Sequence, residues 1–321
     1  MPNVVLDAMI KRADFAQETE DKSIELFDKF DIMKIQPKAP VINMLRKPDF
    51  QRETNHWSPD QIAEFIQSFA NGQLIPSLIL WKSNSHVFVI DGGHRLSALR
   101  AWVENDYGDG PISQAFFGGD VPATQKAVAK QARTKVENSV GRFADIAAAL
   151  DNEGSDAALK KIASTTFTRA IPVQWIQGSQ EVAEVSFFKI NSQGTPLDEV
   201  EELILKNRKK SYAIAARALV RAGTGNKYWS GFDEPTRGKI EKDANELYQL
   251  LFQPDLTMPV KTLDLPLGGS VSPVDAFKLL LDMYALVDGK ERVEKFIGSL
   301  PDDKDGSLTL GVLTRTGKLI R

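Results

Sequence analysis

The sequence predicts an α+β fold: a small mixed sheet with helices, followed by a mainly helical C-terminal region. Strand-like runs rich in β-branched and aromatic residues lie between residues 78 and 176, where helical patterns separate them. From residue 211 onward, helical patterns dominate. We therefore expect an N-terminal helical segment over residues 1–40, a mixed domain over 41–210 and a helical region over 211–321.

The first elements follow from local signals. Residues 1–35 are expected to form one or two polar, amphipathic helical segments. A helix is predicted to begin at Ser58, because a proline at the first helical position and Gln61 three residues on complete a capping box. Gly72 suits the end of that helix. Two short apolar runs, 78–81 and 87–90, are separated by polar residues and predict a β-hairpin.

The later elements follow in the same way. Asp91-Gly92-Gly93 is a turn signal, and Leu96, Leu99 and Val103 then lie on one face of a predicted helix. Beyond it we predict, in chain order, a strand at 112–117, helices over 118–165, a strand at 167–176 and a buried helix at 182–190. Cap residues at 195–198 start another helix, and residues 308–313 are predicted as a short strand.

Composition limits the chemistry. The 40 basic and 43 acidic side chains give a net charge of −3, so any contact with nucleic acid needs a local basic patch. The chain has no cysteine, which excludes disulfides, thiolate metal sites and cysteine nucleophiles. All three histidines, His56, His86 and His94, lie in the first 94 residues. With no leader-like or membrane-spanning apolar run, we expect a cytoplasmic protein.

The junction Asp91-Gly92-Gly93-His94-Arg95 is the strongest candidate for a functional site. A strand that ends in glycines and leads into a helix presents unpaired backbone N–H groups, which attract anions. Arg95 can make paired hydrogen bonds to phosphate, and His94 can bind phosphate or act as a base. Asp91 can hold Mg²⁺ or fix His94. An ordinary turn with a solvated arginine is the alternative, and the local pattern leaves both readings open.

Three segments of the sequence resemble one family. Residues 91–99 resemble the Asp-Gly-Gln-Gln-Arg or Asp-Gly-Gln-His-Arg signature of a ParB/sulfiredoxin-like superfamily. Its members include the N-terminal domain of GmrSD-type modification-dependent restriction systems and the DNA-phosphorothioation regulator DndB. Residues 48–52, with Trp57 after them, are similar to the Pro-Asp-aromatic-Gln-Arg element that opens the GmrSD-type domain. Residues 188–197 are similar to its Asn-x-x-Gly-Thr-Pro-Leu element, and the resemblance covers about residues 40–210.

The resemblance implies a ParB/sulfiredoxin-like nucleotide-binding fold, often with NTP hydrolysis, in antiphage defence or DNA modification. By matching position, it implies that Asp91, His94 and Arg95 form the core of an NTP site, with Mg²⁺ on Asp91. The other residues implied to bind the nucleotide are Gly92, Gly93, Gln51, Arg52, Asn191 and Gly194. Further defence-system proteins are the implied partners.

Two departures from the family pattern change these expectations. Gly93 stands where the family usually has glutamine, so we expect nucleotide binding more than turnover. GmrSD-type proteins often carry an HNH-like nuclease domain that needs a histidine base, and no histidine follows His94. An HNH nuclease is therefore not expected in this chain. Sulfiredoxin chemistry is excluded because it requires cysteine.

Two other functions remain open. One is a DNA-binding, ParB-like regulator in which Arg52 and Arg95 contact the DNA backbone, and the other is a nuclease built on the same fold. The densest basic run, 206–210, and the basic residues between Lys126 and Arg142 are the local patches that DNA contact would use. The competing interpretation is that both are solvated helix surfaces, with the first also favoured by a helix dipole.

Overall fold

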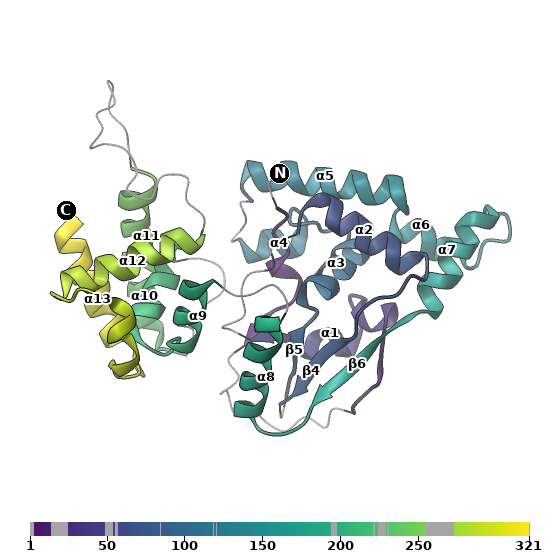
Figure 1. Cartoon of the computed structure of the whole chain (residues 1–321). Coiled ribbons are helices and arrows are strands. Elements are labelled where there is room, and N and C mark those ends of the chain that lie inside the picture. Colours follow the sequence, from purple (N-terminus) through teal and green to yellow (C-terminus); the bar gives the residue numbers. More distant parts are fainter. Residues whose placement is uncertain are drawn as a thin grey trace. The chain divides into compact units, whose positions relative to one another are not determined.

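The chain divides into two compact units, Met1–Gln193 and Gly194–Arg321 (Figure 1). The computed structural model describes residues 3–13, 25–48, 54, 57–83, 85–117, 119, 121–193, 198–220, 222–223, 229, 231–254 and 273–320, with the backbone alone at 181, 188, 191–193 and 273–274. The predicted α+β class is confirmed. The domain limits predicted at residues 40 and 210 stay predictions, because a division by compactness is not a family boundary.

One mixed sheet forms the centre of the first unit. Among the described residues it has six strands in the order β1-β3-β5-β4-β6-β2. In chain order these are β1 Arg12–Ala13, β2 Lys29–Asp31, β3 Leu45–Pro48, β4 Leu78–Lys82, β5 Val87–Asp91 and β6 Ala170–Ile176. Pairs β1–β3, β3–β5 and β4–β6 are parallel, whereas β4–β5 and β2–β6 are antiparallel. The predicted hairpin is thus confirmed as β4 and β5.

The strand directions bring several chain ends to one edge of the sheet. Because β3 and β5 are parallel neighbours, the segment that follows Pro48 and the segment that follows Asp91 leave from the same edge. Strand β4 is antiparallel to β5, so it begins at that edge. In open sheets ligands bind outside the carboxyl ends of parallel strands. This edge is therefore where a ligand site is expected.

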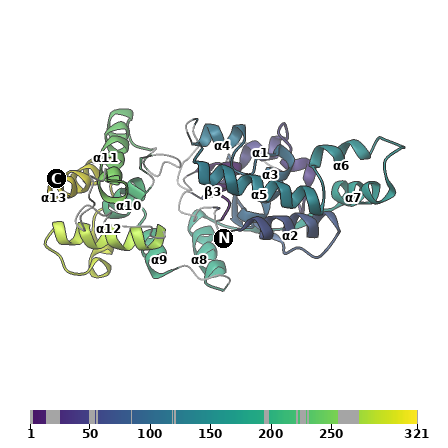
Figure 2. The same ribbon diagram turned by 90° about the horizontal axis from the view of Figure 1, so that it is seen from above.

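Helices cover the sheet in the first unit. They are α1 Pro40–Met44, α2 Pro59–Ala70, α3 Gly93–Glu104, α4 Pro111–Phe116, α5 Ala123–Ser139, α6 Phe143–Ala149, α7 Ala157–Thr168 and α8 Gln180–Gln193. Helix α2 packs against α3 and α5, and Figures 1 and 2 show these three close together. Helix α8 packs instead against β5 and β6. The core includes the fully or almost fully buried Phe69, Phe88 and Trp102.

Three predicted elements are wrong. The described part of residues 1–35 contains no α-helix; it includes the 3-10 helix Asp7–Met9, β1, β2 and the 3-10 helix Ile32–Ile35 (η2), and Phe30 of β2 is buried opposite Ile171 in a strand pair. Residues 112–117, predicted as a strand, lie almost wholly in α4, where Pro111 takes the first helical position and buried Asp106 accepts hydrogen bonds from Ser113. Residues 308–313, also predicted as a strand, lie within a helix of the second unit.

The second unit is helical in its described part. Its α-helices are α9 Glu199–Lys206, α10 Ser211–Val220, α11 Glu234–Phe252, α12 Pro273–Val287 and α13 Ser307–Ile320. Two 3-10 helices, Val293–Lys295 and Ile297–Ser299, lie between α12 and α13. Helix α10 is buried over nearly its whole length and contacts α11, α12 and α13, so it is the centre of this unit. The predicted helical C-terminal region is confirmed.

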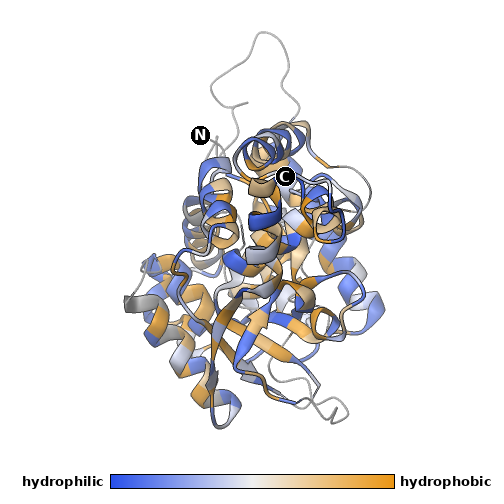
Figure 3. Cartoon of the chain, turned by 90° about the vertical axis from the view of Figure 1, so that its right-hand side faces the viewer, coloured by the Kyte–Doolittle hydropathy of each residue, from blue (hydrophilic) through white to orange (hydrophobic). Residues whose placement is uncertain are grey.

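Burial of one helix face is the common packing rule in both units. Figure 3 shows hydrophilic and hydrophobic colours alternating around the helices, as expected where one face is buried.

No helix in the described part of the chain combines the length and the apolar character needed to cross a membrane.

Candidate functional site

The turn between β5 and α3 has the geometry that the sequence predicts. Strand β5 ends at Asp91, and Gly92 is the N-cap of α3 in the left-handed region, with φ 98°. A Cβ atom at Gly92 would lie 2.4 Å from Cδ2 of Leu78, so glycine is needed for space as well as for the backbone angle. Within the part of the chain that the structure describes, no side chain caps this helix. The backbone N–H groups of a first helical turn point out of the helix, where they can donate to an acceptor such as a phosphate oxygen.

Arg95 lies in the first turn of α3 and is directed at its own chain. Its side chain is 12% exposed; Nη2 forms an ion pair with Asp91, and Nη1 donates to the carbonyl oxygens of Pro76 and Ser77. The guanidinium thus joins the start of β4 to the end of β5. A guanidinium has five N–H donors. Contacts with described residues use three of those in Arg95, so two can serve a ligand.

Asp91 is the accessible carboxylate of this junction. Its side chain is 44% exposed, and only Oδ2 is engaged in the ion pair with Arg95. Among the described residues there is no group of three or more His, Asp or Glu side chains that could hold a metal ion. A single exposed carboxylate fits Mg²⁺ that is also held by nucleotide phosphates, which is the usual way proteins bind this ion. It does not fit a fully protein-ligated metal centre.

His94 links the second sequence element to the first. Its ring is stacked on the indole of Trp57, with centroids 5.5 Å apart and an interplanar angle of 27°. Phe65 of α2 packs edge-on against the same indole at 5.4 Å. The side chain of His94 is thereby held at the N-terminus of α3 beside the segment that carries Trp57. Two elements separated in the sequence meet in space.

The parallel pair β3–β5 explains why these elements meet. Leu45 is opposite Val87 and Arg46 is opposite Phe88, so continuing the register brings Pro48 level with Ile90. Neighbouring strands are about 4.8 Å apart. Gln51 and Arg52, which were predicted as nucleotide contacts, follow Pro48 but lie outside the described residues.

The third element approaches the same sheet edge. Gly178, just before α8, accepts a hydrogen bond from Nε1 of Trp81 at 3.1 Å, which places the start of α8 beside the hairpin end of the sheet. The helix packs along β5, and its 14 residues extend about 21 Å, against about 17 Å for the strand. Its last turn, which includes Asn191, therefore reaches toward the end of β5 that carries Asp91. Gly194 lies outside the described residues.

The basic residues between Lys126 and Arg142 are largely paired with carboxylates. Arg133 binds Asp109 at 2.6 Å, Lys135 binds Asp60 and Arg142 binds Asp145 at 2.8 Å. The run 206–210 is similar: Lys206 binds Glu202 at 2.6 Å, and Lys210 binds Asp302 at 2.9 Å. These pairs reduce the free positive charge that either patch offers to DNA phosphates.

A buried polar cluster near the site was missed from the sequence. It consists of Asp7, Arg12, Lys47 and Thr54, and the charged side chains are at most 2% exposed. Nothing in their spacing brings them together, because Asp7 and Lys47 are 40 positions apart. One signal was present: Lys47 shares a strand face with buried Leu45 in β3, and a lysine on an inward face needs buried partners.

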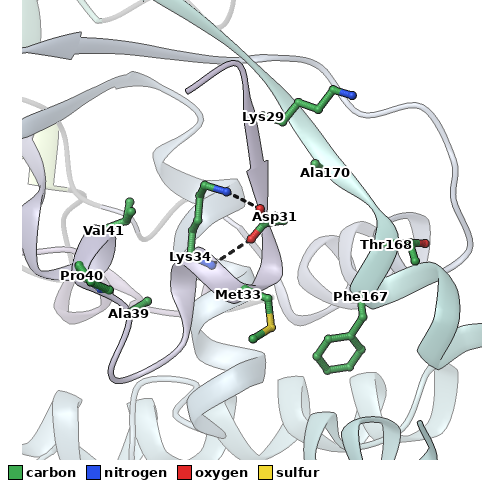
Figure 4. A pocket seen from close by; sticks show the side chains of 10 residues that line it. All are labelled: Lys29, Asp31, Met33, Lys34, Ala39, Pro40, Val41, Phe167, Thr168 and Ala170. Atoms are coloured by element: carbon green, nitrogen blue, oxygen red, sulfur yellow. Dashed lines mark hydrogen bonds and ion pairs between the residues drawn. The ribbon is translucent and has the colours of Figure 1, made fainter. Parts of the chain in front are cut away.

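Two pockets among the described residues lie away from the junction. The larger, of about 550 Å³, opens between the β2–η2 segment (29–35), the start of α1 and the end of α7. Figure 4 shows Lys34 of this pocket directed at Asp31, with Met33 and Phe167 below this pair. The second, of about 280 Å³, is lined in part by Trp102, Tyr107 and Phe143. Neither is lined by Asp91, His94 or Arg95.

Comparison with known families gives one match. The model of the family described as GmrSD restriction endonuclease, N-terminal domain, matches residues 25–208, which is more than half of the 321 residues. All three sequence elements, at 48–57, 91–99 and 188–197, fall within the matched range. No curated protein and no solved structure matches the chain. The wider ParB/sulfiredoxin-like assignment stays a prediction.

Proposed function

This chain belongs to the family of the GmrSD restriction endonuclease N-terminal domain, and from that premise we propose that it binds a nucleoside triphosphate with Mg²⁺. The phosphates bind at the N-terminus of α3, and the bound nucleotide controls a restriction activity directed at DNA. The protein binds the nucleotide and hydrolyses it slowly.

One observation carries the proposal: no side chain of the described residues caps α3, which begins at the sheet edge where parallel β3 and β5 both end. The N–H groups of the first turn, together with the helix dipole, form an anion site that needs no further charge. Gly92 keeps this site open, because any side chain there would collide with Leu78. An aromatic wall, Trp57 with His94, lies beside it.

The side chains then have separate roles. Backbone N–H groups at the start of α3 donate to phosphate oxygens, and Arg95 adds its two remaining donors while it holds the start of β4 in place. Asp91, exposed at the strand end, supplies one carboxylate to the Mg²⁺ that accompanies the nucleotide. The metal neutralises phosphate charge when bound. Gln51, Arg52, Asn191 and Gly194 complete the proposed contacts.

Hydrolysis needs a group that orients or deprotonates water. The family signature usually supplies a glutamine where this chain has Gly93, so only His94 remains as the candidate base in the motif. Its ring is stacked on Trp57, which restricts how it can turn toward a water. We therefore propose that turnover is slow and that the bound NTP acts chiefly as a signal to a nuclease partner.

The alternative of direct DNA binding through the basic patches has weaker support. Arg133, Lys135 and Arg142 all have carboxylate partners. A DNA-binding regulator would show affinity that falls steeply with salt and needs no nucleotide. That dependence separates the two functions experimentally.

The test is a panel of ATP, GTP, CTP and UTP, each with Mg²⁺, followed by thermal unfolding and by titration calorimetry. A nucleotide present at a hundred times its Kd should stabilise the protein by about 2.7 kcal/mol. In Arg95→Ala the calorimetric affinity should fall at least about tenfold, the equivalent of about 1.4 kcal/mol.

Arg142→Ala is the matched control. It removes an arginine whose side chain is 62% exposed and pairs with Asp145 of α6, so nucleotide affinity should not change. Calorimetry is done at a temperature where Arg95→Ala is folded, because that variant also frees the carbonyls of Pro76 and Ser77. No binding of any of the four nucleotides to the wild type, or equal binding to Arg95→Ala, contradicts the proposal.

A further inference from the structure

The N-terminal segment, residues 3–12, is built into the candidate site although it precedes the family match, which begins at residue 25. The backbone N–H of Val4 donates to the carbonyl oxygen of Trp57 at 2.9 Å, and that of Leu6 to the carbonyl oxygen of Thr54 at 2.8 Å. Trp57 is the residue whose indole stacks on His94. The segment therefore fixes the backbone that carries the aromatic wall of the site.

Thr54 is held at every polar atom. Its carbonyl oxygen accepts from Leu6, its backbone N–H donates to Oδ1 of Asp7 at 3.2 Å, and its hydroxyl accepts from Nζ of Lys47 at 2.8 Å. The side chain and backbone are 3% exposed. These three hydrogen bonds and the burial restrict both the backbone and the side chain of Thr54.

Pro48, on the other side of residues 49–53, is held by the same buried polar cluster. Nη1 of Arg12 donates to the carbonyl oxygen of Pro48 at 3.2 Å, while Nη2 of Arg12 binds Oδ1 of Asp7 at 2.7 Å. Lys47 precedes Pro48, and its ammonium has three acceptors: Oδ1 of Asp7 at 2.6 Å, the carbonyl oxygen of Asp7 at 3.1 Å and the hydroxyl of Thr54. Asp7 is thus the shared partner of both ends.

We infer that Asp7, Arg12 and Lys47 are positioning residues for the nucleotide site: they fix Pro48 and Thr54, and through Thr54 they hold Trp57 against His94. The inference rests on the proposed function for its binding consequence. The positional consequence, the stack of Trp57 on His94, is independent of any nucleotide.

The chemistry of the cluster favours a positioning role over simple stabilisation. Buried ion pairs are weak contributors to stability, and apolar residues of similar size often replace them without loss. Buried ion pairs orient the groups they join, because each hydrogen bond fixes the relative position of one donor and one acceptor. Here the cluster fixes Pro48 and Thr54, the described residues on either side of residues 49–53.

The experiment compares Asp7→Asn with a control that destabilises the same unit elsewhere. Asp7→Asn keeps the shape of the side chain and removes the charge that Arg12 and Lys47 bind. Ile146→Ala is the control: Ile146 is fully buried in α6 and belongs to the same core. Both variants should lower the melting temperature, and Ile146→Val is a milder control if the two shifts differ.

Two readouts separate positioning from stability. The first is the ring-proton NMR signal of His94, which the indole of Trp57 shifts; with three histidines in the chain, His94→Gln assigns it. In Asp7→Asn this signal should move toward the position of an unstacked histidine, and in Ile146→Ala it should not. The second is the affinity for the tightest NTP of the panel, expected to fall about tenfold or more in Asp7→Asn only, as for other groups that orient ligating residues.

The outcomes are distinct. Equal loss of affinity in the two variants at equal melting temperature, or a His94 signal that stays in place in Asp7→Asn, overturns the positioning role. If the wild type binds no NTP, the proposed function falls, and the His94 signal alone decides the inference. Lys47→Met, which removes the ammonium but keeps the length of the side chain, should reproduce the His94 shift; an unmoved signal also counts against the cluster.

Discussion

Helices α2 and α3 have the same length, 12 residues, and pack against each other, yet their N-termini differ. In α2, Ser58 and Gln61 form a capping box: the hydroxyl of Ser58 accepts from the N–H of Gln61 at 3.3 Å, and Oε1 of Gln61 accepts from the N–H of Ser58 at 2.9 Å. In α3 the cap position is Gly92, and no side chain takes part.

The difference shows how one fold uses the same local structure in two ways. A capped N-terminus satisfies its own donors and contributes to stability. An open one leaves its donors for a ligand, and the surrounding residues then decide whether a ligand binds. Around α3 those residues are Asp91, Arg95 and the stacked pair of His94 with Trp57. At the start of α2, the carboxylate of the first turn, Asp60, is paired with Lys135, and Ser58 and Gln61 cap the helix.

The largest expected effect comes from Gly92→Ala. A left-handed backbone costs a non-glycine residue about 1–2 kcal/mol, and crowding in a packed core adds about 1–3 kcal/mol. The new Cβ would lie 2.4 Å from Leu78, which is fully buried and has little room to move. Chemical denaturation should show the free energy of unfolding reduced by about 2–5 kcal/mol.

Gly141→Ala is the control that measures the cost of the left-handed backbone alone. Gly141 has φ 105°, close to that of Gly92, but the nearest atom to its Cβ position is 3.9 Å away. Only the left-handed cost, about 1–2 kcal/mol, should appear there. Equal losses in both variants would mean that the close approach of Gly92 to Leu78 is not a feature of the folded protein.

The second largest effect is expected in the stabilisation by NTP, from His94→Asp, which places a carboxylate in the first turn of α3. Its interaction with the helix dipole gains about 0.3–1 kcal/mol, and the lost ring contact costs about 0.5–1.5 kcal/mol, so stability without ligand should change little. The carboxylate repels phosphate, so the stabilisation by NTP, about 2.7 kcal/mol at a hundred times Kd, should disappear. Thermal shifts of His94→Asp that equal those of wild type with Mg²⁺ and nucleotide would contradict phosphate binding at this turn.

The smallest effect is expected from Ser58→Ala in the capped helix. Loss of the cap should reduce the free energy of unfolding by about 1 kcal/mol, within the usual range of about 0.5–2. Nucleotide affinity should be unchanged, because α2 uses its donors internally. A loss of affinity comparable to that of His94→Asp would show that the two helix ends are not functionally different.

The comparison of α2 and α3 also shows what the sequence could predict. Ser58, Pro59 and Gln61 act within a few residues, so the start of α2 follows from the sequence alone. The same holds for the hairpin and for the turn at Gly92, whose signals are local. The strand-to-helix junction of the candidate site was therefore predicted correctly, and its binding role stays a prediction.

Contacts between distant residues could not be predicted. The fate of residues 25–35 depends on the pairing of Phe30 with Ile171, and a short apolar run is compatible with either helix or strand until that partner is known. The cluster of Asp7, Arg12 and Lys47 depends on β3 lying beside β1. Charged residues are so often exposed that their burial here had no strong local signal.

The central claim is that phosphate binds at the open N-terminus of α3, and amide NMR tests it most directly. Mg²⁺ with the tightest NTP of the panel is titrated into labelled protein, and the N–H signals of Gly93, His94 and Arg95 are followed beside those of Asp60 and Gln61 in α2. We predict large, saturable shifts in α3 and none beyond the general salt effect in α2. Unshifted α3 signals at saturating nucleotide, or equal shifts at both helix ends, would contradict the claim.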